Sequence, residues 1–385
     1  MTELPKKLIA KLTERQSNNA LRKLAAPNGL VDFSSNDYLG LARNVELFNK
    51  ASKFLENKGV MANGATGSRL LTGNYKLYDE LEGVLAKFFG SESALVFNSG
   101  YDANLGFFSA VPQRTDVVFY DELSHASIRD GLGMGLAHSY KFKHNQLEDL
   151  RERIDRVRQR KPDSDIYVVT ESVFSMDGDS PDLKALAALC TSQGSYLVVD
   201  EAHAVGVFGK RGEGLLNQLV LQDKVFARIV TFGKAMGCHG AAILGSNALK
   251  SYLVNFARSF IYTTGLPPHS SATILAACKY MSVSGGEQVQ LRRNIDYFKE
   301  QLRGHDLEPY FIPSNSAVHC CLVEGNEKVK KWSLQLRDKG FDVKPILSPT
   351  VRGGQERLRF CLHSYNTENE IKEVLYILSK LFDQR

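Results

Sequence analysis

The feature that most constrains the fold of this chain is a regular alternation of short apolar runs with helical patterns. Segments with leucines at helical spacing alternate with the runs and predict helices, among them residues 77–89 and 147–160, and small or polar residues follow each run. This β-α-β rhythm predicts an α/β fold, in which helices cover both faces of a mostly parallel central sheet. The apolar runs are residues 94–97, 117–120, 166–170 and 195–200.

The composition is that of an ordinary globular protein and excludes several other classes. Hydrophobic residues make up 43% of the chain and charged residues 24%, which argues against a disordered or fibrous chain. The net charge of +5 includes no concentrated basic arm, so we expect no nucleic-acid partner. The sequence has no membrane-length apolar run and no signal-peptide pattern at its start. Six scattered cysteines without a C-x-x-C pair favour reduced thiols in a cytoplasm and no metal site.

The order of elements predicts three parts of the chain. A solvated helix and a short strand occupy residues 1–45, and the alternating region belongs to a large domain, residues 46–283. A connecting helix then leads into a smaller C-terminal α/β domain, residues 284–385. In the last predicted strand, Arg359 alternates with its apolar neighbours. It is either a solubilising charge on an edge strand or a bidentate clamp for a carboxylate.

One lysine stands at an unusual position, on a turn of small residues between two apolar runs. Lys234 follows the run 225–230 and precedes the run 240–245. An amine that is screened from water in such a place loses part of its preference for the charged form and becomes a nucleophile toward carbonyls. The alternative is an exposed lysine in a hairpin, which is the commoner environment of this residue.

An acid and a histidine favour the first interpretation. Asp200 ends the buried run 195–200, and His203 follows three residues later. Ligands of open α/β sheets bind at the carboxyl ends of the strands, so both side chains are expected beside Lys234. Pyridoxal phosphate requires a lysine, a carboxylate for its ring nitrogen, and donors for its phosphate. We therefore predict a pyridoxal phosphate site at this edge of the sheet.

Two other loops that follow strands supply candidate partners. Gly100 and Tyr101 open a helix, whose backbone amides and positive dipole end can hold a phosphate. His125 carries a flat ring that could stack on a heteroaromatic cofactor, although a purely structural role is the alternative. The glycine-rich stretch 63–73 lacks the Gly-Lys-Ser/Thr ending and predicts no nucleoside-triphosphate site.

Longer motifs connect these residues to a family. The chain resembles the α-oxoamine synthases, fold-type I pyridoxal-phosphate enzymes that join an amino acid to an acyl thioester. The resemblance runs from the first helix to the last and implies a C-acyltransferase with this fold and cofactor. The motifs are FSSNDYLGL at 33–41, LSHAS at 123–127, VFSMDGD at 173–179, VDEAH at 199–203, TFGK at 231–234 and PTV at 349–351.

The resemblance implies a role for each cofactor residue. Lys234 forms the internal aldimine, Asp200 pairs with the pyridinium nitrogen, and His125 stacks on the ring. His203 and Ser175 contact the 3-oxygen of the ring. The implied phosphate contacts are Thr231, the amides of Gly100 and Tyr101, and Thr263 or Thr264 from the second subunit of a homodimer.

The resemblance also implies substrate contacts. Asn36 and Arg359 hold the amino-acid carboxylate, and Thr350 lines the substrate site beside His125. Arg22 meets a carboxylate at the far end of the acyl chain. The implied acyl donor is a thioester of coenzyme A or of an acyl carrier protein.

Three interpretations of the function stay open. The first is condensation of L-alanine with a pimeloyl thioester, which Arg22 and the run 176–179 favour. The second is a member of the family that uses glycine or serine, since the runs 200–206 and 237–240 depart from the commonest pattern. The third is a non-catalytic doubly wound module for nucleotides, which the absence of G-x-G-x-x-G after the first strand of the sheet disfavours.

Overall fold

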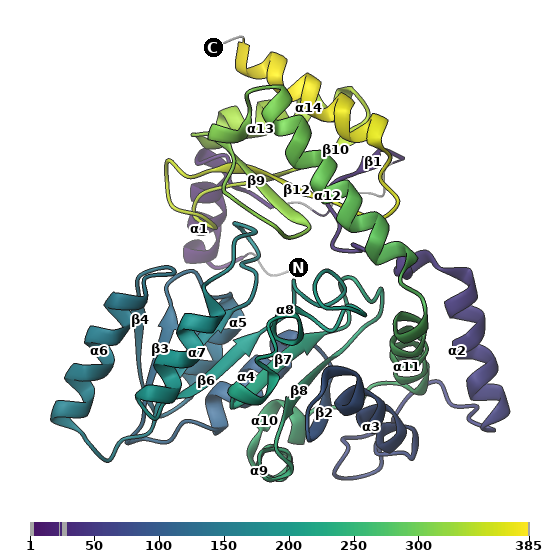
Figure 1. Cartoon of the computed structure of the whole chain (residues 1–385), viewed down its shortest axis with the longest axis vertical. Coiled ribbons are helices and arrows are strands. Elements are labelled where there is room, and N and C mark those ends of the chain that lie inside the picture. The colour runs from purple at the N-terminus through teal and green to yellow at the C-terminus, as the bar shows by residue number, and fades with distance from the viewer. Residues whose placement is uncertain (1–3, 23, 25–28, 384–385) are drawn as a thin grey trace. The chain divides into compact units, whose positions relative to one another are not determined.

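The computed structural model of the protein describes residues 4–22, 24 and 29–383. The chain divides into two compact units, each described by itself. The large unit comprises residues 36–175 and 179–292, and the small unit comprises residues 1–35, 176–178 and 293–385. The division passes through helix α12 (Gly286–Gly304), drawn in green in Figure 1.

A seven-stranded sheet lies at the centre of the large unit, in the order β2-β8-β7-β6-β5-β3-β4. Among these described strands, β8 alone runs against its neighbours β7 and β2, and the other pairs are parallel. The predicted α/β fold with a mostly parallel sheet is confirmed. The strands are β2 (Ser93–Phe97), β3 (Val117–Asp121), β4 (His138–Phe142), β5 (Ile166–Glu171), β6 (Tyr196–Asp200), β7 (Ala227–Thr231) and β8 (Ala241–Gly245).

Helices predicted from leucine spacing at 77–89 and 147–160 are confirmed residue for residue. Several helices begin at a side-chain cap, because Asn44, Ser99 and Ser246 each accept a backbone N–H of the first turn. None of the described helices is long and apolar enough to cross a membrane. The helices of the large unit before α12 are α2 (Val45–Asn57), α3 (Leu77–Phe89), α4 (Gly100–Ala110), α5 (Ala126–Met134), α6 (Leu147–Arg160), α7 (Leu183–Ser192), α8 (Leu215–Gln218), α9 (Asn247–Phe256), α10 (Arg258–Ile261) and α11 (Pro268–Val283), with 3-10 turns at Leu41–Arg43 and Gln222–Lys224.

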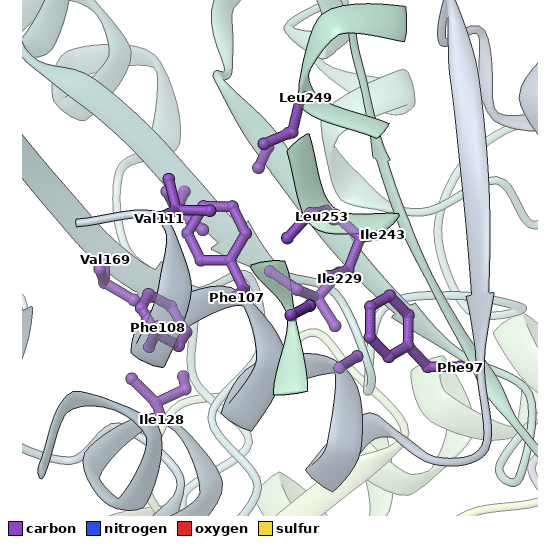
Figure 2. Packing of buried hydrophobic residues seen from close by; sticks show 14 of the residues in the cluster. Phe97, Phe107, Phe108, Val111, Ile128, Val169, Ile229, Ile243, Leu249 and Leu253 are labelled. Carbon is purple, nitrogen blue, oxygen red and sulfur yellow. The ribbon is translucent and has the colours of Figure 1, made fainter. Parts of the chain in front are cut away.

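The core of the large unit fixes helix α4 against the sheet. Phe107 and Phe108 on α4 are at most 1% exposed and pack with Ile229 of β7 and Ile243 of β8 (Figure 2). Leu253 of α9 completes this layer. Burial of such side chains stabilises the fold by about 1.5–3 kcal/mol each. The N-terminus of α4, which bears the predicted phosphate contacts, is therefore held at a defined place beside β7.

The small unit contains two small sheets and its own helices. Strand β1 (Val31–Asp32) pairs in parallel with β10 (Phe341–Asp342), which joins residues far apart in the sequence. An antiparallel sheet has the order β11-β12-β9. The remaining elements are β9 (Val318–Leu322), β11 (Lys344–Ile346), β12 (Arg357–Cys361), α1 (Lys6–Ser17), α13 (Asn326–Asp338), α14 (Glu368–Asp383) and a 3-10 turn at Glu308–Tyr310.

The edge-strand alternative for Arg359 is wrong. Its strand β12 is the central one of its sheet, between β11 and β9. Arg359 is 7% exposed, and its neighbours Leu358 and Phe360 are fully buried. Its Nη1 donates a hydrogen bond to Cys361 Sγ at 3.0 Å. Because the central strand β12 is covered on both faces, side chains that point to opposite faces are both buried, and Arg359 is buried where an edge strand would have exposed it.

Candidate active site

A cavity of about 250 Å³ in the large unit brings most of the predicted residues together at the carboxyl edge of the sheet. Its lining combines residues that follow β2, β3, β6 and β7, as the strand-end argument predicted. The predicted residues that line it are Asn36, Gly100, Tyr101, His125, Asp200, His203, Thr231 and Lys234. The lining also includes Ser99, Asn104, Ser127, Glu171, Ala202, Gly233, His239 and Gly240, for which the sequence analysis predicted no role.

Lys234 lies on a tight loop between the antiparallel strands β7 and β8. The loop is closed by backbone hydrogen bonds from Gly237 N to Lys234 O and from Cys238 N to Phe232 O, both 2.8 Å. Gly237 has φ +63°, and a Cβ there would lie 2.2 Å from Ala42 N. Only glycine fits such a position. The lysine is thus held on a loop with little freedom to move away from the cavity.

Asp200 and His203 are buried side chains with defined partners. Asp200 is 6% exposed; its Oδ1 accepts from Ala202 N and its Oδ2 from Asn104 Nδ2, each at 2.9 Å. His203 is 5% exposed, and its Nδ1 hydrogen-bonds with Tyr38 Oη at 2.6 Å. Donors to both oxygens fix the orientation of the carboxylate. Asp200 can therefore present a fixed negative charge to a cationic ring nitrogen.

His125 caps the N-terminus of α5 and is held through both its ring and its backbone. Its Nδ1 lies 2.7 Å from Ser127 Oγ and accepts from Ser127 N at 3.2 Å. Its backbone N–H donates to Glu171 Oε1 at 2.6 Å. The surrounding protein lowers the pKa of His125, mainly because desolvation disfavours the charged form. A neutral imidazole at the cavity is suited to lie against a flat ring.

The other end of the cavity has the features of a phosphate site. Ser99 caps α4 and leaves the amides of Gly100 and Tyr101 in its first turn. A Cβ on Gly100 would lie 2.6 Å from Thr231 Cγ2, so backbone and threonine approach closely. Thr231 Oγ1 is buried without a hydrogen-bond partner in the described part of the chain. An anionic group bound at this helix N-terminus would satisfy it, so these residues fit the phosphate of pyridoxal phosphate.

Three other predicted residues of the large unit do not line this cavity. Ser175, Thr263 and Thr264 belong to the large unit, where Asn98 Nδ2 donates to Thr263 Oγ1 at 3.1 Å and to Thr264 O at 2.7 Å. Thr350 and Arg359 belong to the small unit, as does Arg22, so the roles of all three stay predictions. Within residues 4–22, 24 and 29–383, no group of three or more His, Cys, Asp or Glu is placed to hold a metal ion.

Sequence reasoning missed three polar residues that connect the predicted ones. Glu171 is the last residue of β5, and an acid at the end of an apolar strand was a usable signal. Asn104 lies inside helix α4, where a single polar residue gives no pattern, and Ser127 in α5 ends the motif 123–127, which by itself assigned it no role. Their roles depend on contacts between elements far apart in the sequence.

Comparisons with known proteins agree with this site. The family model described as aminotransferase class I and II matches residues 28–378. The 8-amino-7-oxononanoate synthase of Emericella nidulans is 37% identical over 383 residues, which cover 94% of this chain and 92% of that protein.

Two solved structures share the fold over nearly the whole chain. Sphingomonas wittichii serine palmitoyltransferase superposes with a TM-score of 0.89 at 26% identity, covering 100% of this chain and 99% of that one. The 8-amino-7-oxononanoate synthase of Francisella tularensis has a TM-score of 0.78 at 30% identity, covering 93% and 99%. With the cavity that unites Lys234 and Asp200, these matches show that the chain belongs to the α-oxoamine synthases, pyridoxal-phosphate-dependent acyltransferases of fold type I.

Proposed function

We propose that this enzyme condenses L-alanine with a pimeloyl thioester, with loss of carbon dioxide, to give 8-amino-7-oxononanoate, as in biotin biosynthesis. The observation that carries the reaction class is the convergence of Lys234, Asp200 and His125 on one cavity. The choice of substrates is supported by relatives at 37% and 30% identity that bear the name of this synthase.

The residues of the cavity divide the work of such a reaction. Pyridoxal phosphate, when bound, supplies an electron sink for the charge that develops at the α-carbon. Asp200, with both oxygens held by donors, keeps a proton on the ring nitrogen. Lys234 Nζ removes the α-proton and later returns a proton to the product. His125 would cover one face of the ring and exclude water from it, and His203 would orient the 3-oxygen.

Substrate recognition is proposed for Asn36, Arg359, Arg22 and Thr350. Asn36 lines the cavity and would bind the amino-acid carboxylate, and we propose that Arg359 shares this role. Arg22 would pair with the far carboxylate of the pimeloyl chain, and Thr350 would line the substrate site. We also propose a cytoplasmic homodimer, in which Thr263 or Thr264 contributes to the phosphate site of the other subunit.

A second candidate is a serine- or glycine-using reaction, such as that of serine palmitoyltransferase. The observation that favours it is the TM-score of 0.89 with the enzyme from Sphingomonas wittichii. A long acyl chain without a terminal carboxylate would leave Arg22 without its proposed partner. The two candidates therefore differ in both the amino acid and the acyl chain that the enzyme accepts.

A thiol-release assay over a matrix of substrates distinguishes the candidates. L-alanine, glycine and L-serine are each combined with pimeloyl, acetyl, succinyl and palmitoyl thioesters of coenzyme A and of acyl carrier protein. We expect release only with L-alanine and pimeloyl thioesters. Release with L-serine and palmitoyl-coenzyme A, and none with L-alanine, would contradict the proposal.

The matched variants test the role of the lysine. Lys234→Ala should abolish thiol release while the protein still binds pyridoxal phosphate through its other contacts. The exposed Lys210 lies outside the cavity, so Lys210→Ala should leave the rate unchanged. Near-native turnover of Lys234→Ala would refute the proposed mechanism.

A further inference from the structure

Glu171 is a second buried acid beside Asp200, and the proposed mechanism gives it no role. It ends β5, and the parallel pairing of β5 with β6 places it opposite Asp200. Both side chains line the cavity, and they are only 3% and 6% exposed. In a parallel sheet, residues directly opposite each other point to the same side. The sheet therefore brings two carboxyl groups together in a place with little water.

A chain of hydrogen bonds joins Asp200 to His125. Asn104 Nδ2 donates both to Asp200 Oδ2 and to Ser127 Oγ, each at 2.9 Å. Ser127 Oγ in turn lies 2.7 Å from His125 Nδ1. Glu171 Oε1 then accepts from the backbone N–H of His125 at 2.6 Å. Together with the pairing of β5 and β6, these contacts close a ring around the inner end of the cavity.

The carboxyl groups of Asp200 and Glu171 differ in the number of hydrogen bonds that would stabilise a negative charge. Both carboxyl oxygens of Asp200 accept hydrogen bonds, whereas the carboxyl group of Glu171 accepts one, from His125 N, and has no other hydrogen-bond partner among the described residues. Two carboxylates that share a buried site do not both ionise readily, and the one with fewer donors keeps the proton. Burial, followed by the charge of Asp200, raises the pKa of Glu171 well above its ordinary value.

The other charged groups around Glu171 do not reverse this order. Lys234, from the loop after β7, opposes the rise, while Asp121 at the end of β3 adds to it. His125, from α5, contributes a backbone N–H and has a lowered pKa of its own, so its ring adds little positive charge.

We propose that Glu171 is a positioning residue of the cofactor site, a neutral acid that anchors the backbone of His125 and leaves Asp200 as the only anion beneath the cofactor ring. This inference rests on the cofactor part of the proposed function and is independent of which amino acid and thioester react. A neutral neighbour matters because a second carboxylate would compete with Asp200 for the positive charge of the ring nitrogen and of Lys234.

Two variants separate the hydrogen bond from the charge. Glu171→Gln keeps an oxygen that can accept from His125 N and is neutral by construction. Glu171→Ala removes the acceptor and leaves a buried N–H without a partner. Glu82→Gln is the matched control, because Glu82 is 4% exposed in the same unit but accepts from Val96 N and pairs with Arg69 and Lys250.

The measurements need no turnover. They are the Kd of pyridoxal phosphate for the cofactor-free protein and the midpoint of the pH titration of the visible absorbance of the bound cofactor. We expect Glu171→Gln to keep both values, and Glu171→Ala to raise the Kd about ten-fold, since ten-fold is about 1.4 kcal/mol and lies within the cost of an unpaired buried donor. Glu82→Gln should lower the urea midpoint of unfolding and leave the titration unchanged.

Three outcomes would overturn the proposal. A shift of the midpoint by about one pH unit or more in Glu171→Gln would show that the native residue is ionised. An unchanged Kd in Glu171→Ala would show that the acceptor does not position His125. If Glu171→Ala does not fold, infrared difference spectra of native protein and Glu171→Gln decide. Loss of a protonated-carboxyl C=O band in the variant supports the proposal, and loss of a carboxylate band overturns it.

Discussion

The residue directly after Asp200 belongs to a buried ion pair whose removal should be costly. Glu201 is 0% exposed and pairs with Arg228 of β7, which is 3% exposed. Arg228 also donates from Nη1 to Phe89 O at 3.2 Å and from Nη2 to Glu213 O. Burial of an ion pair contributes little net stability, whereas removal of one partner leaves an uncompensated charge. We therefore predict that Arg228→Met is strongly destabilising.

The magnitude follows from what Glu201 retains in the variant. Losing the partner of a buried charge costs about 3–5 kcal/mol. Glu201 Oε1 still accepts from Leu215 N at 2.7 Å and Leu216 N at 3.0 Å, so we expect the lower end, about 3 kcal/mol. Burial already raises the pKa of Glu201, and Arg228 opposes this effect. Without Arg228 the folded state binds a proton more readily than the unfolded state, so the loss should shrink as the pH falls.

Urea unfolding of the cofactor-free protein measures this cost. Native protein, Arg228→Met, Glu201→Gln and the double variant are compared at about pH 8 and about pH 5.5, because a carboxyl with a raised pKa binds a proton more readily at the lower pH. The double variant has no unpaired buried charge and should recover more than half of the stability that Arg228→Met loses. A loss below about 1 kcal/mol in Arg228→Met, or a double variant no more stable than Arg228→Met, would refute the reasoning.

Two further predictions concern loops of the large unit. Although burial acts in the opposite direction, hydrogen bonds to Asp121 and Asp179, both 2.9 Å, raise the pKa of His144 to about 10. The stability that the charged form of His144 adds is complete below its ordinary pKa and is lost as the pH rises through about 10. His144→Gln should therefore destabilise the protein by about 1–3 kcal/mol in urea unfolding at low pH, and this difference should vanish by about pH 10. A difference that stays constant with pH would contradict the prediction. Gly237→Ala should lower the midpoint of thermal unfolding and the affinity for the cofactor, because Gly237 has φ +63° and an added Cβ would meet the backbone of Ala42. Unchanged values in both assays would show that the loop adapts.

Much of the fold could be predicted because its elements have local signals. The helices at 77–89 and 147–160 have leucines at helical spacing, and strands such as β5 and β6 are continuous apolar runs. Strand β4 was missed because four of its five residues are exposed, so it has neither an apolar run nor alternation. Its place is set by pairing with β3, which is a tertiary contact.

The residues of the site also fall into those with a local sequence signal and those placed by tertiary contacts. Lys234, Asp200 and His203 stand at the ends of apolar runs, so a rule about strand ends was sufficient to bring them together. Asn104 has no such signal, since it lies 96 residues from Asp200 in the sequence and meets it only after α4 packs on the sheet. The burial of Arg359 was likewise decided by the pairing of β12 on both sides. Patterns in a single sequence do not predict contacts between residues that are far apart in the chain and meet only when its elements pack together.

The cofactor chemistry of this protein is a consequence of strand order. Strands β5, β6 and β7 are consecutive neighbours in the sheet, and they provide Glu171, Asp200 and the loop that carries Lys234. Neighbouring strands lie about 4.8 Å apart, so a ring held between Asp200 and Lys234 needs a span of about one strand spacing. An insertion in a loop elsewhere would leave this spacing intact, whereas a slip of one residue in the β6–β7 register would turn Asp200 to the other face. Reaction class therefore depends on sheet register, and substrate choice can change through loop residues without disturbing it.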